Sequence, residues 1–174
     1  MDKLISKKVF IYGVPGSGKT YLSQKIADEL NLPLFEADTL RDELRKLTTK
    51  EESLFLFLGT SRAFSQFGEL NTENVIKGLK AVREALANRV EKEIKNHDEV
   101  VMEGAFLDPN LLKGCGRLIL VVTSEEEQHR DHFFKHRENS MENVEQFKAA
   151  RVIQNFLINE AKDLGVEILE NEKY

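Results

Sequence analysis

The sequence predicts an α/β fold with a parallel sheet covered by helices on both faces. Short apolar runs typical of strands alternate along the chain with longer segments of helical periodicity. The runs are apolar almost throughout, as parallel strands buried on both faces are. We expect residues 1–174 to form a single domain, because no linker, repeat or low-complexity block divides them.

Five apolar runs carry the strand signal, and a polar residue or a glycine soon follows most of them. They span residues 7–12, 34–37, 100–102, 118–122 and 166–169. Ligands of parallel α/β sheets bind beyond the carboxyl ends of the strands. The residues at those ends, Gly13, Asp38, Glu103 and Thr123, are therefore candidates for a functional site.

The first half of the chain contains two helical regions. Apolar residues recur at four-residue spacing from Leu22 to Leu30, and this helix should end before Pro33, which disfavours helix in the residue before it. Residues 39–67 look helical in two or three pieces. Their phenylalanine- and leucine-rich stretch, residues 54–58, is expected to pack in the core.

The second half is expected to hold two long helices and a shorter one between them. Asn71 or Thr72 can cap the first long helix, whose apolar stripe continues for six turns. Ser124 with Glu127 matches a capping box for the short helix. The last helix, over residues 142–164, should end at the glycine that follows it.

Composition limits the classes of protein that this chain can be. A net charge of −5 with 41% hydrophobic residues excludes a disordered chain, and it argues against nucleic acid as a partner. The single cysteine, Cys115, has no partner for a disulfide within the chain and suits a reducing compartment. No apolar run approaches the roughly 20 residues of a membrane span. We expect a cytoplasmic monomer or homodimer.

The strongest motif lies directly after the first strand. GVPGSGKT matches the P-loop pattern G-x-x-x-x-G-K-[ST], whose glycines let backbone amides surround a polyphosphate at a helix N-terminus. A chance glycine-rich turn is the alternative. Lys19 would bridge the β- and γ-phosphates of ATP, and the Thr20 hydroxyl would bind Mg²⁺. The residues expected to bind ATP are Gly13, Pro15, Gly16, Ser17, Gly18, Lys19 and Thr20.

A carboxylate and two arginines follow the second strand. Asp38 could accept the proton of a substrate hydroxyl or hold Mg²⁺ through water. Arg41 and Arg45 share a helical face with it and could bind an anionic substrate through bidentate hydrogen bonds. In the structural alternative, Asp38 caps the helix, or Thr39 caps it in a box with Asp42, and the arginines are solvated.

Other candidate residues come from the third strand and the apolar stretch. Glu103 ends its strand where a carboxylate can serve the metal, although a solvent-facing residue is the alternative. Gly104 would let a substrate approach the backbone closely. Ser61 and Arg62 interrupt an apolar stretch and could bind the phosphate or carboxylate of a small substrate.

Residues 124–141 are expected to form a helical lid. Arg130 and Arg137, seven residues apart, lie near one helical face and could neutralise the charge of a phosphoryl group in transfer. A solvated charged helix is the alternative. His132 and His136 have the spacing of metal ligands, but the interleaved arginines and the missing acidic ligand disfavour a zinc site.

The chain resembles the archaeal 2-phosphoglycerate kinase family. The resemblance is carried by VVMEGAFLDP at residues 100–109, TSEEEQHRDHFFKHR at residues 123–137, and the closing stretch 147–171. Such kinases transfer the γ-phosphoryl group of ATP to the free hydroxyl of 2-phosphoglycerate, giving 2,3-diphosphoglycerate. The resemblance implicates the P-loop together with Glu103, His129, Arg130, Arg137 and Arg151.

Together these features predict a three-layer P-loop NTPase fold like that of nucleoside monophosphate kinases, with strand order 2-3-1-4-5. The expected activity is phosphoryl transfer from Mg·ATP to a hydroxyl of a small phosphorylated or carboxylated metabolite. Substrate-binding residues would be Asp38, Arg41, Arg62, Glu103 and Gly104, with Mg²⁺ on Thr20 and Glu103. An adenylate-type nucleotide kinase, a nucleotide-dependent binding module and an RNA 5′-hydroxyl kinase remain alternatives.

Overall fold

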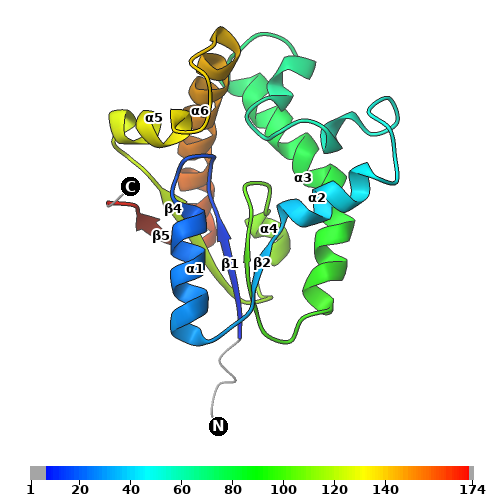
Figure 1. The fold of residues 1–174 in the computed structure, drawn as a ribbon, viewed down its shortest axis with the longest axis vertical. Coiled ribbons are helices and arrows are strands. Elements are labelled where there is room, and N and C mark those ends of the chain that lie inside the picture. The colour runs from blue at the N-terminus through cyan, green and yellow to red at the C-terminus, as the bar shows by residue number, and fades with distance from the viewer. Residues whose placement is uncertain (1–6, 173–174) are drawn as a thin grey trace.

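The computed structural model describes residues 7–172, and it confirms the expected α/β architecture (Figure 1). All neighbouring strands pair in parallel, in the expected order β2-β3-β1-β4-β5. The strands are β1 (Lys8–Tyr12), β2 (Leu34–Glu36), β3 (Val100–Glu103), β4 (Arg117–Val122) and β5 (Glu167–Glu170). Because β1 lies at the centre, the loop that follows it emerges in the middle of the sheet edge.

The helices join these strands in the expected sequence. They are α1 (Lys19–Leu30), α2 (Asp38–Arg45), α3 (Thr72–Lys95), α4 (Pro109–Leu112), α5 (Glu126–Phe134) and α6 (Met141–Leu164). Two 3₁₀ turns, η1 (Leu54–Leu56) and η2 (Ala63–Gln66), precede α3. No helix in the described residues is long and apolar enough to cross a membrane.

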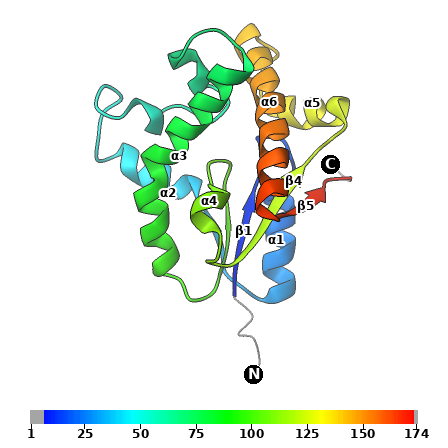
Figure 2. The ribbon, with the colours of Figure 1, turned by 180° about the vertical axis from the view of Figure 1, so that it is seen from behind.

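The core has two halves because side chains alternate between the faces of each strand. Val9 and Ile11 of β1 pack with α1 on one face. Phe10 and Tyr12 point to the other face, where α3 and α6 bury their apolar stripes. Accordingly, α1 lies in front of the sheet in Figure 1, and α6 lies in front of it in Figure 2. The four side chains from Val9 to Tyr12 are fully or almost fully buried.

Backbone hydrogen bonds align the strand ends that carry the candidate residues. The amide of Ala37 donates to the carbonyl of Glu103 at 2.8 Å, and the amide of Gly104 donates to that of Ile11 at 3.1 Å. The ends of β2, β3 and β1 therefore lie side by side. Asp38 and Glu103 are thereby brought to the same edge as the P-loop.

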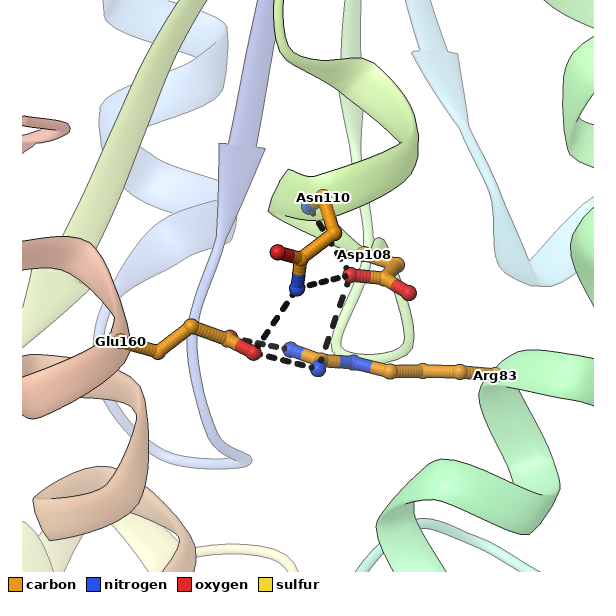
Figure 3. A network of polar contacts seen from close by, with 4 residues as sticks. All are labelled: Arg83, Asp108, Asn110 and Glu160. Atoms are coloured by element: carbon orange, nitrogen blue, oxygen red, sulfur yellow. Dashed lines mark hydrogen bonds and ion pairs between the residues drawn. The ribbon is translucent and has the colours of Figure 1, made fainter. Parts of the chain in front are cut away.

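A buried charge network joins three helices behind this edge (Figure 3). Arg83 of α3 donates to both carboxylate oxygens of Glu160 of α6, at 3.1 and 2.9 Å. Asp108, the N-cap of α4, lies 3.7 Å from the same guanidinium, and Asn110 bonds to both acids. The Arg83 side chain is 4% exposed. The network ties α3, α4 and α6 together against Tyr12.

Several local expectations were wrong. Ser124 does not cap α5: its amide and hydroxyl bond to Glu170, the last residue of β5, and Glu125 caps the helix instead. Residues 39–67 do form three helical pieces, α2 and two 3₁₀ turns, but α4 was missed altogether. Neither Asp38 nor Thr39 caps α2, because its N-cap is Ala37 and receives no side-chain hydrogen bond.

Candidate active site

The P-loop adopts a conformation that needs its glycines. Gly16 and Gly18 have φ values of 79° and 92°, in the left-handed region that glycine tolerates best. Space is also restricted: a Cβ on Gly16 would lie 3.1 Å from the backbone of Phe133 in α5. A Cβ on Gly13 would lie 2.5 Å from the carbonyl oxygen of Val121. The loop is thus packed between β4 and α5 (Figure 1).

The end of the loop is suited to an anion. Gly18 is the N-cap of α1 and supplies no capping side chain, and Lys19 and Thr20 open a first turn without acidic residues. The partial positive charge at this helix end is therefore not offset locally. The Lys19 ammonium lies 3.4 Å from the Val14 carbonyl, across the loop, and the Thr20 side chain is exposed. These groups fit a polyphosphate with a bound Mg²⁺.

Lys19, Glu103 and Asp38 interact electrostatically. Burial lowers the pKa of the Lys19 ammonium, and the carboxylates of Glu103 and Asp38 oppose this shift. Burial raises the pKa of Glu103, and Lys19 opposes that shift in turn. Only 8% of Glu103 is exposed. Two oxygen-bearing acids thus face one ammonium beside the exposed Thr20 hydroxyl, a donor set that a hard cation such as Mg²⁺ prefers.

A cavity of about 330 Å³ opens on one side of the P-loop. It brings together Lys19 and Arg137, which were predicted to be catalytic, and three residues predicted to bind the substrate, namely Asp38, Arg41 and Arg62. Three arginines and one lysine face a single carboxylate here. Its remaining lining residues are Pro15, Gly16, Gly59, Thr60, Ser61, Ala105 and Gln146.

The cavity arginines are held by aromatic rings and by α6. The guanidinium of Arg41 lies 5.0 Å from the ring centroid of Phe106, and its buried Nε has no hydrogen-bond partner among the described residues. Burial lowers the pKa of Arg41, and Asp38 opposes the shift. Arg137 lies 4.2 Å from the Phe133 ring and donates to the Phe133 carbonyl at 2.7 Å. Stacking fixes these cations while leaving donors for a ligand.

Other predicted residues lie outside the cavity lining. Arg130 lies over Phe147 at 4.8 Å and pairs with Glu126 at 3.7 Å. Arg45 donates to the Leu56 carbonyl at 2.6 Å, which gives it a structural role. Gly104 has a packing reason to be glycine, since a Cβ there would lie 2.9 Å from that of Ala37.

Arg62 has a partner that the sequence did not indicate. It forms an ion pair with Glu142 in the first turn of α6, so this cation is partly neutralised. Sequence reasoning also missed Thr60 and Gln146, both of which line the cavity. Thr60 is only 4% exposed, yet its neighbours form no motif. Gln146 lines the cavity from α6, a helix that begins 103 positions after Asp38 in the sequence. Only the folded structure shows that the two residues lie near each other.

Two further hollows border the P-loop on its other side. One is lined by Thr20 and Tyr21 of α1 and by His132 and Lys135 near the end of α5. A second, of about 210 Å³, lies between α1 and the end of β5 and includes Asn171. Their positions beside α1 leave room for the rest of a nucleotide. Apart from the P-loop residues that line them, no sequence motif marked either hollow.

A family model described as an AAA domain matches residues 12–148, which include the P-loop and the whole lining of the cavity beside it. The chain belongs to this AAA-domain family. The matched region also includes Asp38, Arg137 and every other residue that lines this cavity, and it excludes β5 and most of α6. No curated protein sequence matches the chain.

Several solved structures share the fold of this family member. Shikimate kinase from Acinetobacter baumannii, in complex with shikimate, has a TM-score of 0.57 at 16% identity, covering 99% of this chain and 87% of that one. A gluconokinase from Sinorhizobium meliloti 1021 has a TM-score of 0.51 at 16% identity, covering 98% and 85%. Deoxyadenosine kinase from M. mycoides with bound dATP reaches 0.50 at 14% identity, covering 95% and 90%. These structural similarities show a shared fold.

Proposed function

We propose that the chain is an ATP-dependent kinase that phosphorylates a hydroxyl group of a small anionic metabolite. The observation that carries this proposal is the cavity beside the P-loop, where Asp38 lies among Lys19, Arg41 and Arg137. A binding module that only hydrolyses nucleotide has no need for a cation-lined second cavity at this position. The shikimate kinase and gluconokinase neighbours support the proposal in that this fold serves kinases of small molecules.

The nucleotide half of the site is built by the P-loop and β3. Amides of residues 13–20 would surround the phosphates of ATP, and Lys19 would contact the β- and γ-phosphates. Thr20 and Glu103 would hold Mg²⁺, which when bound neutralises phosphate charge. Burial lowers the pKa of Lys19, and the two acids beside it oppose that shift and so favour the charged ammonium. The loop is thus able to orient the γ-phosphorus toward the acceptor cavity.

The acceptor half supplies a base and anion-binding groups. Asp38 would accept the proton of the acceptor hydroxyl. The hydroxyl oxygen would at the same time form its bond to the γ-phosphorus, while the bond between the γ-phosphorus and the oxygen of the leaving ADP breaks. Arg41 and Arg62 would hold the anionic groups of the acceptor. Arg130 and Arg137 would neutralise the transferring phosphoryl group, with Arg130 first leaving its contacts on α5 and α6. No proton is left unassigned in this scheme.

We propose 2-phosphoglycerate as the first acceptor to test. It carries both a phosphate and a carboxylate beside a free hydroxyl, which matches several cations around one carboxylate. Of the described residues that line the cavity, none is aromatic and none has a long apolar side chain. Such a lining gives a nucleobase no stacking surface, and this favours a small acid over a nucleoside monophosphate.

Labelled ATP provides the test. Purified protein is incubated with γ-labelled ATP and Mg²⁺ and with one acceptor at a time: 2-phosphoglycerate, shikimate, gluconate, glycerate, AMP, CMP or UMP. We expect a labelled product with an anionic hydroxy acid and none with Lys19→Ala. Product with a nucleotide alone would support the nucleotide-kinase alternative. Slow ATP hydrolysis that no acceptor accelerates would refute the kinase proposal.

A further inference from the structure

The outward-facing carbonyl groups of the P-loop have partners in the second half of the chain. A loop that turns amides inward toward an anion must direct carbonyl groups outward. Nε2 of His129, from α5, lies 2.8 Å from the Pro15 carbonyl oxygen. The Thr123 hydroxyl, after β4, donates to the Ser17 carbonyl at 3.2 Å. Both contacts join segments more than 100 residues apart.

The surroundings of His129 determine which nitrogen carries its hydrogen. The side chain is fully buried, with its ring 5.0 Å from that of Phe147. Nδ1 lies 3.4 Å from a guanidinium nitrogen of Arg151, and a guanidinium only donates hydrogen bonds. Nδ1 is therefore the acceptor, and Nε2 carries the hydrogen that is donated to Pro15. Burial lowers the pKa of His129, and Arg151 adds to the shift, so the neutral ring is favoured.

Helix α6 holds the second contact in place. Gln154 accepts from the Thr123 amide at 3.0 Å and donates to the Thr123 carbonyl at 2.9 Å. Arg151, one turn earlier, donates to the carbonyls of Thr123 and Ser124 at 2.7 and 3.0 Å. The same arginine thus contacts both His129 and the segment that binds Ser17. One face of α6 thus supports the partners of both of these P-loop carbonyl groups.

We propose that His129 is a positioning residue that maintains the anion-binding shape of the P-loop through the Nε2 hydrogen bond to the Pro15 carbonyl, with Arg151 orienting its ring. His129 itself does not line the acceptor cavity. Without this donor, the peptide group after Pro15 has no buried partner to keep its oxygen facing outward. Rotation of that peptide group would present an oxygen to the phosphates in place of an amide.

The proposal predicts a specific kinetic pattern. Loss of the donor should raise the Kd for Mg·ATP by roughly 10-fold or more, as expected when a buried carbonyl loses its partner. The KM of the acceptor should stay within about twofold of wild type, because the cavity lining is unchanged. This inference rests on the proposed function only for the identity of the nucleotide ligand.

Three substitutions at one position test the inference. Gln places an amide donor at nearly the reach of Nε2, Asn is one carbon shorter, and Phe keeps the ring but has no donor. We expect His129→Gln to retain nucleotide affinity, and His129→Asn and His129→Phe to lose it. Ile153→Val is the matched control, because it removes one buried methyl group from α6 and costs about 1 kcal/mol of stability without a polar change.

Calorimetry with Mg·ATP and with Mg·ADP gives affinities without any acceptor, and melting temperatures are recorded for every variant. Equal affinities for wild type and His129→Phe would overturn the positioning role. So would equal losses for Gln and Phe, or a loss in Ile153→Val at a matched melting temperature. Absence of nucleotide binding by the wild-type protein would instead refute the proposed function.

Discussion

The buried pair between Arg83 and Glu160 gives the sharpest stability prediction. Both side chains are largely removed from water, with 4% and 12% exposed, and two hydrogen bonds of 3.1 and 2.9 Å join them. In Glu160→Gln the volume is kept while the negative charge is lost. Removing one partner of a buried pair costs about 3–5 kcal/mol, since the other charge stays buried. Asp108, at 3.7 Å, remains to compensate in part, so we expect about 3 kcal/mol.

Denaturation in urea followed by circular dichroism measures this change. For a domain of this size, 1 kcal/mol shifts the melting temperature by about 2–4 °C, so about 3 kcal/mol gives about 6–12 °C. The double variant Arg83→Met/Glu160→Leu removes both charges and should recover most of the loss. Lys77→Met, which breaks an exposed ion pair with Glu73 on the same helix, is the control and should change stability by less than about 1 kcal/mol. A double variant as unstable as Glu160→Gln would refute the reasoning.

Four further predictions concern the site. Lys19→Ala should lower kcat for phosphoryl transfer by at least about 10²-fold, because a cation on the transferring group is lost. Asp38→Asn should lower kcat by roughly 10²–10⁴-fold with little change in the KM for ATP, if the carboxylate is the base. Arg41→Met should raise the acceptor KM by roughly 10- to 100-fold, as for the loss of charge-assisted hydrogen bonds, and Arg41→Lys by less, because it keeps the charge but not the fork. Burial lowers the pKa of His129 in the folded protein, so as the pH falls below 6.5 the unfolded chain binds a proton on this histidine before the folded chain does. The melting temperature of the wild-type protein should therefore fall more steeply from pH 7 to pH 5 than that of His129→Gln.

A specific outcome would contradict the last three of these predictions. Steady-state kinetics that leave kcat intact in Asp38→Asn would remove the carboxylate from the proton transfer. An unchanged acceptor KM in Arg41→Met would place the anionic group of the substrate elsewhere. If the melting temperatures of wild type and His129→Gln depend on pH in the same way, His129 has the same pKa in the folded and the unfolded protein.

The sheet could be predicted from local pattern because its strands are buried. Runs such as residues 118–122 have few polar positions, and the strand order, which was expected from the likeness to the fold of nucleoside monophosphate kinases, is confirmed. Strand ends also placed Asp38 and Glu103 at one edge. Asp38 and Glu103 could be placed because the strands are recognised from local periodicity and because ligands of parallel sheets bind beyond the carboxyl ends of the strands. Neither argument needs a contact between distant side chains.

Contacts between distant segments could not be predicted in this way. Ser124 fits a capping box, yet Glu170 competes for its amide and hydroxyl from the end of β5. Arg62 looks free to bind substrate, but the fold places Glu142 beside it. The Pro15 carbonyl accepts a hydrogen bond from His129, whose neighbours in the sequence suggested only a charged helix. In each case the competing group is more than 40 positions away.

The two halves of the site have different support. The P-loop grows from β1, which pairs with a strand on each side, whereas α2 follows β2, a three-residue strand at the border of the sheet. Asp38 and Arg41 therefore follow a strand that has fewer hydrogen bonds to the rest of the sheet than β1 has. Hydrogen exchange should be slowest in β1 and faster in β2. A library of substitutions in α2 should accordingly yield altered acceptor preferences at little expense in thermal stability, while the same effort around β1 should yield insoluble protein.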